Sequence, residues 1–313
     1  MPGSTVTVFG ASGRQGQAQV RRLLADGHRA RAVSRHAGIL SGPAFAGAQV
    51  VSADYADADS VARACDGADT VFFQPPQVER PDRTMAFALQ VAQTAKRCGV
   101  RRLVLNSTMW APDAPCGNPF YDFVLAIENA MAEAGPPLVV FRPTVFMDNW
   151  LMAFAKPVLL REHVYRYPHR PGLRYSPICL DDVARFMVAA LGRDDLVGER
   201  IRIAGPQTLT PPDVAVILSK AMGVQIRYEY QAPADFGNYL YDLYGPETGM
   251  DRESYVGAFS AFYTFNNEAS QEPFRFDVAP TLARIPLTLE TFADWAQRQD
   301  WTRLDDAVGS LTR

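Results

Sequence analysis

Lysine and cysteine are scarce in this sequence, and long apolar runs are missing. The chain has four cysteines, none of them in a Cys-x-x-Cys pair, so neither a disulfide scaffold nor a cysteine metal site is indicated and a reducing compartment fits. No stretch approaches the roughly 20 apolar residues that a membrane-spanning helix needs. The first residues, MPGSTVTVFG, lack the basic and apolar regions of a signal peptide. We therefore expect a cytoplasmic protein.

The charge balance gives little indication of a partner. The 313 residues carry 31 Lys and Arg against 34 Asp and Glu, a formal net charge of -3, so nothing predicts a nucleic-acid partner. With 48% apolar residues, the chain has ample material for a hydrophobic core. No metal-ligand spacing is present, and we expect no metal. The lysines are Lys96, Lys156 and Lys220, so any chemistry that requires lysine can be tested by inspection.

Short apolar segments alternate with helical patterns through the first half of the sequence. The expected strands are 5–9, 29–34, 49–52, 69–73, 102–106 and 138–142, and helices are expected after residue 16 and near 60–65, 84–98 and 120–134. This alternation is typical of parallel strands whose sheet is covered on both faces. We predict an α/β fold with a doubly wound parallel sheet.

The first expected strand ends at a glycine-rich loop with the spacing G-x-x-G-x-x-G. Gly10 would permit the tight turn, Gly13 would let the backbone approach a pyrophosphate, and Gly16 would let the following helix pack on the sheet. The N-terminus of that helix would offer unpaired N–H groups to phosphates. The loop also contains Ser12, Arg14 and Gln15. We predict that it binds a dinucleotide, the alternative being a glycine-rich turn with no ligand.

The end of the second strand indicates which dinucleotide is bound. An acid there would hydrogen-bond the ribose diol of NAD, but the sequence has Ser34, Arg35 and His36 and no nearby acid. Cationic side chains favour the 2′-phosphate of NADP(H). Arg14 could reach the same phosphate or lie solvated on the surface. Asp54, after the third strand, could accept a hydrogen bond from the adenine amino group or cap the following helix.

Recognisable segments are spread over nearly the whole chain. They include VFGASGRQGQAQVRRLLADGHRARAVSR, AKRCGVRRLVLNST, FRPTVFMDNWL, ICLDDVARFMVAAL and TFADWA. Together they resemble the NmrA-like group of atypical short-chain dehydrogenases/reductases. The resemblance implies a Rossmann domain over residues 1–150 that binds NADP(H), with its sheet completed by segments near 175–205. A smaller α+β lobe over residues 151–313 would take the substrate or a partner.

The resemblance also implies where the two halves of the cofactor lie. The glycine loop, Arg35 and Asp54 would line the adenosine and phosphate half. The nicotinamide half would be lined by residues at the ends of the fourth, fifth and sixth strands: Phe73, Gln74, Pro75, Asn106 and Pro143. Asp148, Asn149 and Glu128 also match family positions, and we interpret them as structural.

The catalytic machinery departs from the parent superfamily. That superfamily places a tyrosine and a lysine four residues apart after the fifth strand, and the lysine lowers the tyrosine pKa. Here Tyr121 is present, but Leu125 stands at the lysine position. Without a cation the phenol should keep a pKa of ~10, so Tyr121 is a weak acid, an aromatic wall or a core residue. Ser107 would hydrogen-bond the substrate, or else bond to backbone at the strand end.

The second half of the chain is less regular. Segments 164–168 and 173–177 are typical of a short hairpin or paired extended segments, kept at an edge by prolines. Asp181 and Thr210 are expected to cap helices, strands are expected over 199–204 and 225–230, and a last helix over 288–298. His163 and His169 lack a metal-ligand spacing and are more often surface or satisfied histidines.

Residues 232–276 hold eleven aromatic side chains. They could line a cleft for a large apolar or aromatic substrate, pack as two helices on the sheet, or form a homodimer interface.

Three functions are compatible with these features. The leading hypothesis is an NADPH-dependent reductase without the Tyr–Lys pair, which transfers hydride to an activated acceptor such as an enone, a quinone or a ketone. The second is an NADP(H)-sensing regulator with no turnover, which Leu125 favours. The third is a redox-neutral enzyme that retains the nucleotide as structure. The least recognisable segment shapes the acceptor site, so the sequence does not identify the substrate.

Overall fold

The computed structural model describes residues 3–76, 81–108 and 112–304 and has one large sheet at its centre. The strand order is β3-β2-β1-β4-β5-β6-β8, and every neighbouring pair is parallel. The strands are β1 (Thr5–Phe9), β2 (Arg29–Ser34), β3 (Gln49–Ser52), β4 (Thr70–Phe73), β5 (Arg102–Asn106), β6 (Leu138–Pro143) and β8 (Arg200–Ile203). The predicted α/β fold with a doubly wound sheet is confirmed.

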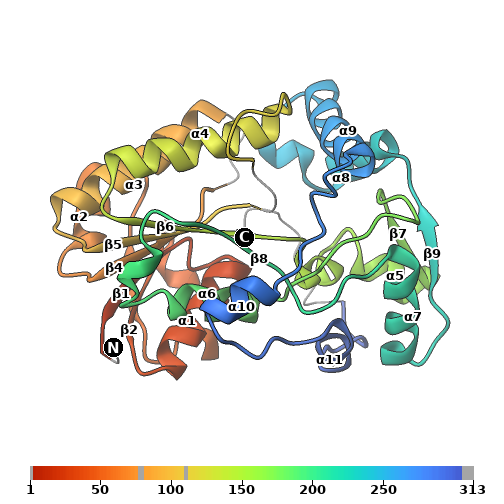
Figure 1. Ribbon diagram of the computed structural model, residues 1–313, viewed down its shortest axis with the longest axis horizontal. Coiled ribbons are helices and arrows are strands. Elements are labelled where there is room, and N and C mark those ends of the chain that lie inside the picture. The colour runs from red at the N-terminus through yellow and green to blue at the C-terminus, as the bar shows by residue number, and fades with distance from the viewer. Residues whose placement is uncertain (1–2, 77–80, 109–111, 305–313) are drawn as a thin grey trace.

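Helices cover both faces of this sheet (Figure 1). One face carries α2 (Ala58–Cys65), α3 (Pro81–Arg97) and α4 (Pro119–Ala134), and the other carries α1 (Arg14–Ala25), α6 (Leu180–Ala189) and α10 (Ala279–Arg284). Alternating strand residues form two apolar cores, because successive side chains of a strand point to opposite faces. Phe141 packs towards α1 and α6, whereas its neighbour Val140 packs towards α3 and α4.

Asp57, rather than Asp54, starts α2. The Asp57 carboxylate accepts hydrogen bonds from the amides of Asp59 and Ser60, which satisfies two free N–H groups of the first turn. Asp54 instead accepts from the Ala56 amide at 2.9 Å and closes the turn before the helix. The helix-cap interpretation of Asp54 is therefore wrong.

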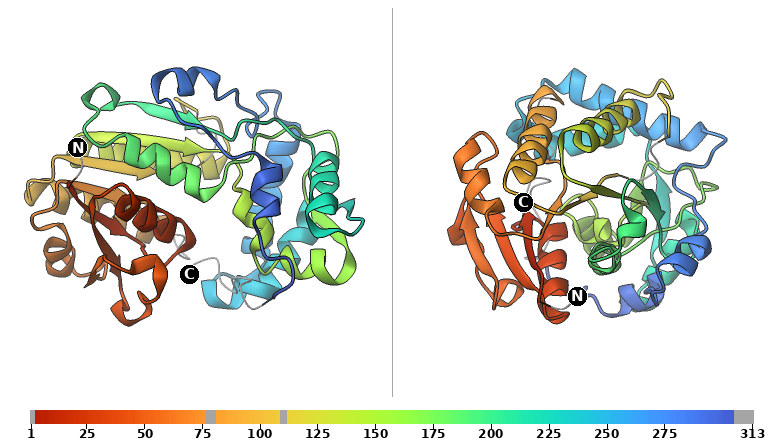
Figure 2. Two further views of the ribbon diagram at one scale, coloured as in Figure 1. Left: turned by 90° about the horizontal axis from the view of Figure 1, so that it is seen from below. Right: turned by 60° about the vertical axis from the view of Figure 1, so that its left-hand side comes forward.

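The remaining elements form a smaller lobe at one end of the sheet (Figures 1 and 2). They are α5 (Lys156–Glu162), β7 (Val164–Tyr167), α7 (Pro211–Met222), β9 (Arg227–Tyr230), α8 (Pro233–Thr248), α9 (Arg252–Glu268) and α11 (Phe292–Gln297). β7 pairs in parallel with β9, and Tyr175 forms an antiparallel bridge with Leu209. The predicted pairing of segments 164–168 and 173–177 is wrong, because each finds its partner far away in the sequence.

Two of the predicted helix starts have different outcomes. Thr210 caps α7 in a reciprocal capping box with Asp213, as predicted. At α6 the N-cap residue is Cys179, and the Leu180 amide is satisfied at 2.9 Å by the carboxylate of Asp148. Asp181 lies inside the first turn, so its predicted capping role is wrong. The last helix is also shorter than predicted, because the Thr291 side chain caps it only at Phe292.

The aromatic segment does form two helices, α8 and α9, but they pack on each other and on the lobe rather than on the sheet. Phe236, Tyr244, Tyr255 and Tyr263 are buried in the core of the lobe together with Trp150. The interpretation that this aromatic stripe covers the Rossmann sheet is therefore wrong. Large aromatic faces give the small lobe a core of its own.

Candidate functional site: the carboxyl edge of the sheet

The glycine loop lies at the carboxyl end of β1, between the neighbours β2 and β4, where the strand order reverses. Gly10 has a φ of +69°, a left-handed conformation that favours glycine. A Cβ on Gly16 would lie 2.4 Å from the Gly10 carbonyl oxygen, so only glycine permits this approach of α1 to the turn. Gly13 is the N-cap of α1 and provides no side-chain cap. Because the N-cap residue has no side chain to accept from the first turn of α1, this end of the helix suits an anion.

Buried amide side chains lie under this loop. Asn106, at the end of β5, donates from Nδ2 to Gln15 Oε1 at 2.5 Å, and Gln19 donates to Gln74 Oε1 at 3.4 Å. Asn106 Oδ1 and Gln19 Oε1 are buried without a hydrogen-bond partner among the described residues. Buried acceptors of this kind normally have a donor, so the cluster has hydrogen-bonding capacity left for a ligand or an ordered water. Gln19 was missed in the sequence, although its spacing of four from Gln15 puts both on one helix face.

The adenosine end of the expected site is open at the ends of β2 and β3. Ser34 and Ser12 bring their hydroxyls within 3.5 Å of each other, and the Arg35 side chain beyond them is exposed. Asp54 is exposed close by. The arrangement fits a nucleotide that carries an extra phosphate.

Arg14 occupies a different place from the one considered for it. Its guanidinium donates to Met152 Sδ at 3.5 Å and lies 3.7 Å from Asp148 Oδ1. Both partners belong to the chain that leaves the sheet after β6, where a 3-10 turn spans Met147–Leu151. In this structure Arg14 connects the glycine loop with the smaller lobe.

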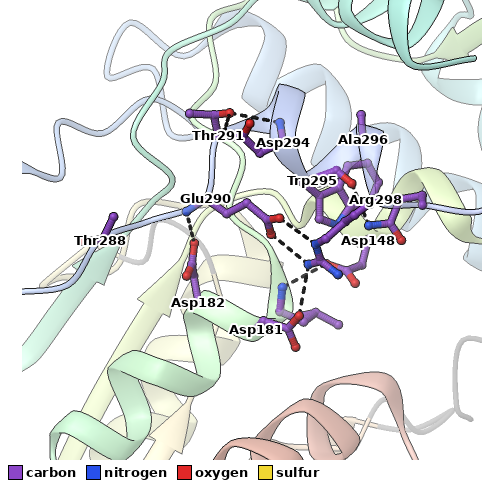
Figure 3. Close-up of polar contacts among 12 residues, drawn as sticks. Asp148, Asp181, Asp182, Thr288, Glu290, Thr291, Asp294, Trp295, Ala296 and Arg298 are labelled. Atoms are coloured by element: carbon purple, nitrogen blue, oxygen red, sulfur yellow. Dashed lines mark hydrogen bonds and ion pairs between the residues drawn. The ribbon is translucent and has the colours of Figure 1, made fainter.

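Asp148 lies in a group of polar residues that connects the sheet with the last helix, α11 (Figure 3). Burial raises the pKa of Asp148, and the nearby Arg14 guanidinium opposes that rise. Arg298, which follows α11, bonds Glu290 at 2.6 and 2.8 Å and Asp181 at 3.1 Å. Glu290 accounts for the largest part of the raised pKa of Arg298. The matched family position at Asp148 is thus structural: it caps the start of α6 and receives Arg14.

The expected nicotinamide end of the site lies at β5, β6 and α4. Ser107 follows β5 and donates from Oγ to Glu128 Oε1 at 2.6 Å. Glu128 is fully buried and accepts from Arg142 at 2.6 Å and from Arg200 at 3.0 Å. Asp113 lies 3.3 Å from the other side of Arg142. Because Asn106 and Ser107 are consecutive, they point to opposite faces, Asn106 to α1 and Ser107 to α4.

Tyr121 is fully buried on α4, two turns before Glu128. Its hydroxyl donates to Asn266 Oδ1 of α9 at 2.7 Å, and its ring contacts Phe120, Phe262 and Phe265. Burial raises the pKa of this phenol well above its usual value of 10.0. The side chain therefore has the surroundings of a packing residue, and its predicted catalytic role finds no support in this arrangement.

The other residues predicted to line the nicotinamide lie at the carboxyl edge of the sheet, and they differ in how far they are buried. The Phe73 ring is fully buried against Phe9 and Tyr55, so only its backbone faces the edge of the sheet. Gln74 is half-buried, and its Nε2 lies 3.5 Å from the position of a Cβ on Gly10. Pro75 is half-buried and Pro143 is buried at the end of β6.

Among the described residues no group of His, Cys, Asp and Glu is arranged to hold a metal ion. Within the same ranges no helix is long and apolar enough to cross a membrane. His169 is buried among aromatic rings, whereas His163 is exposed just after α5.

The comparison with known proteins agrees with this fold. The profile of the NmrA-like family matches residues 2–296, and the chain belongs to that family. A (4-alkanoyl-5-oxo-2,5-dihydrofuran-3-yl)methyl phosphate reductase of Streptomyces griseus is 31% identical over 243 residues, which are 72% of this chain and 76% of the relative.

Solved structures show the same fold at lower identity. The NADPH-dependent quinone oxidoreductase of Escherichia coli in complex with NADPH has a TM-score of 0.74 and 20% identity, covering 93% of this chain and 98% of the other. NmrA, a negative transcriptional regulator in complex with NADP, has a TM-score of 0.71 and 17% identity, covering 97% and 100%. A solved reductase and a solved regulator thus share this fold.

Proposed function

We propose that this protein is an NADPH-dependent reductase that transfers hydride to a small activated acceptor such as an enone, a quinone or a ketone. The observation that supports this best is the glycine loop at the carboxyl end of β1. The Gly16 position leaves no room for a Cβ, and the N-cap residue of α1 provides no side-chain cap. The cofactor is NADP(H), since Arg35 stands where NAD-binding proteins have an acid. A cytoplasmic location fits its four free cysteines.

The side chains have separate tasks in this mechanism. The amides of the glycine loop hold the pyrophosphate, and Arg35 binds the 2′-phosphate. Asn106, held by Gln15, offers its unpartnered Oδ1 towards the cofactor. NADPH supplies the hydride when it is bound. Ser107 uses its hydrogen in the bond to Glu128 and keeps its oxygen lone pairs for a donor on the acceptor substrate or the carboxamide.

The proton that completes the reduction comes from water in this proposal. The Tyr121 hydroxyl is bonded to Asn266, and no lysine stands four residues further on, because that position is Leu125. Enones and quinones suit such a site, since hydride addition gives them a stabilised anion that water can protonate. An unactivated ketone would need a stronger acid and should be reduced more slowly.

The test is consumption of NADPH, followed at about 340 nm with a panel of enones, quinones and ketones. We expect turnover that favours NADPH over NADH. Arg35→Gln should weaken the binding of NADPH about 10- to 100-fold and leave the binding of NADH unchanged, because only NADPH carries the 2′-phosphate. Arg63→Gln, at an exposed arginine of α2, is the matched control. No loss of NADPH above the blank with any acceptor would reject the reductase.

A regulator that senses NADP(H) without turnover is the second candidate. Leu125 in place of the lysine and the buried Tyr121 favour it, because both remove the proton relay of the parent superfamily. This candidate predicts binding of NADP⁺ or NADPH by calorimetry together with no reduction of any acceptor. The small-molecule substrate would then be replaced by a partner protein, and a homodimer stays a prediction in either case.

A further inference from the structure

Three arginines lie side by side on the face of the sheet that α4 covers. Arg142 of β6 is the register partner of Arg202 of β8, and Arg200 lies two residues before Arg202 on the same face. The alternating residues Ile201 and Ile203 point into the opposite core, with α6 and α10. The sequence pattern RIRI thus places two guanidinium groups on the α4 side of the edge strand.

Among the described residues, only one buried carboxylate forms ion pairs with these three arginines. Glu128 bonds Arg142 and Arg200, and the exposed Asp113 lies beside Arg142. Arg202 has no carboxylate within ion-pair distance in the described part of the chain. It contacts instead the ring of Phe276, 4.6 Å from its guanidinium carbon, and the carbonyl of Arg275 at 3.5 Å.

The positive charge of Arg202 is not balanced by a carboxylate of the described residues. Its side chain is half-buried, and burial together with the neighbouring charge of Arg142 lowers its pKa. A guanidinium has five N–H donors, and the single hydrogen bond at 3.5 Å is at the limit of useful length. Cations withdrawn from water are normally paired with an anion. The fold therefore keeps a cation here whose partner is not in the described part of the chain.

The place of Arg202 relates it to the acceptor rather than to the cofactor phosphates. β8 is four strand positions from β1, roughly 19 Å at about 4.8 Å per strand, so the guanidinium is remote from the glycine loop. It lies nearer the carboxyl edge than Arg200, and its charge acts on the Tyr121 phenol of α4. Ser107 directly follows β5, which is two strands from β1 and two from β8. A molecule placed over Ser107 and extending away from β1 would meet Arg202.

We propose that Arg202 binds an oxyanion, a carboxylate or a phosphate monoester, at the end of the acceptor away from the reacting carbon. This inference rests on the proposed reductase function and specifies its substrate class. A planar guanidinium offers two parallel N–H groups to such an anion, and the ring of Phe276 fixes its plane. Neutral acceptors would then react, but with weaker binding.

The kinetic test compares matched acceptors that differ only in charge. Enone carboxylates are assayed beside their methyl esters, and enone phosphate monoesters beside the corresponding alcohols. We expect the wild-type protein to favour one charged series by at least about tenfold in kcat/KM, which identifies the anion. Arg202→Gln should remove that preference by raising KM for the charged acceptors, while kcat/KM for neutral acceptors stays within about twofold. Arg202→Lys should keep part of the preference.

Arg284→Gln is the matched control, because Arg284 is an exposed arginine of α10 that pairs with Glu199 on the far side of β8. It should leave the preference for charged acceptors unchanged. An equal effect of Arg202→Gln on charged and neutral acceptors, or no preference in the wild type, would overturn the proposal while the reductase function stands.

Calorimetry separates this proposal from the reductase function. The saturated carboxylate and the saturated phosphate monoester, which accept no hydride, are titrated into the NADP⁺-bound protein and its Arg202→Gln variant. We expect binding that the variant weakens at least about tenfold. Binding of this kind without turnover of any acceptor would leave the anion site standing and reject the reductase. Equal binding by both proteins, or none, would reject the anion site.

Discussion

The hydroxyl of Ser107 donates a 2.6 Å hydrogen bond to the carboxylate of Glu128, and this bond fixes what the serine can offer at the carboxyl edge of the sheet. Glu128 also accepts from Arg142 and Arg200 and is fully buried. Because the serine hydrogen is used inside the protein, only the oxygen lone pairs of Ser107 remain for a further partner. Ser107 is therefore placed to accept a hydrogen bond rather than to donate one to a carbonyl oxygen.

The Glu128 cluster should contribute strongly to stability. Glu128→Gln removes the negative charge from two arginines, one of them almost entirely buried, and loss of one member of a buried ion pair typically costs about 3–5 kcal/mol. We expect the free energy of unfolding in urea to fall by that amount. Glu133→Gln, at an exposed position on the same helix, should change it by less than about 0.5 kcal/mol. Equal effects of the two substitutions would contradict the structural importance of this cluster.

Glycine-to-alanine substitutions at two helical positions should act in opposite directions. A Cβ at Gly16 would lie 2.4 Å from the Gly10 carbonyl oxygen, so Gly16→Ala must displace the loop, lowering stability and abolishing NADPH binding. A Cβ at Gly257, in the exposed part of α9, meets nothing within 4 Å. Gly257→Ala should therefore stabilise the protein by about 0.5–1 kcal/mol. Thermal unfolding and NADPH titration of both variants measure the contrast; intact binding in Gly16→Ala would mean that the loop does not cradle the pyrophosphate.

Tyr121→Phe tests the role of the tyrosine. The substitution removes the hydroxyl that donates to Asn266, and a buried acceptor without a donor typically costs about 1–3 kcal/mol. We expect a loss of stability of that size, while the turnover of enone acceptors stays within about twofold of the wild-type rate. If turnover instead dropped by two orders of magnitude or more with little loss of stability, Tyr121 would be identified as the proton donor.

The sequence predicted the sheet well because the information there is local. The central strands β1, β4, β5 and β6 are short apolar runs next to helical patterns. The turn at Gly10 needs glycine whatever the rest of the chain does. The cap at Thr210 is also local, since its capping-box partner is three residues away.

Several of the errors concern contacts between distant segments. β7 pairs with β9 across about 60 residues of sequence, and Asp148 caps a helix that begins 32 residues later. Neither pairing leaves a periodic signal near the residues involved. No local sequence signal distinguishes Arg200 from Arg202 either. Arg200 pairs with Glu128 of α4 and Arg202 contacts the ring of Phe276, a difference that arises only when the helix packs on the sheet.

His169 gives the stability of the protein a predictable dependence on pH. Its side chain is buried among the rings of Tyr167, Tyr175, Tyr263 and Phe274, and its Nδ1 has no partner among the described residues. Burial lowers the pKa of His169 from 6.5 to about 3. Between these values the unfolded chain binds a proton that the folded protein does not, so stability must fall as the pH falls through this range.

Replacing this histidine should remove that part of the pH dependence. His169→Phe keeps an aromatic ring in an aromatic setting, and we expect its free energy of unfolding to fall less steeply than that of the wild type below pH 6.5, by up to about 1.4 kcal/mol per pH unit. Above about pH 7.5 the two curves should run parallel, because the histidine is neutral in both states. Urea unfolding at intervals from about pH 4.5 to 8.5 measures the difference. Parallel curves over the whole range would show that His169 titrates alike in the folded and unfolded chains and is therefore accessible to water.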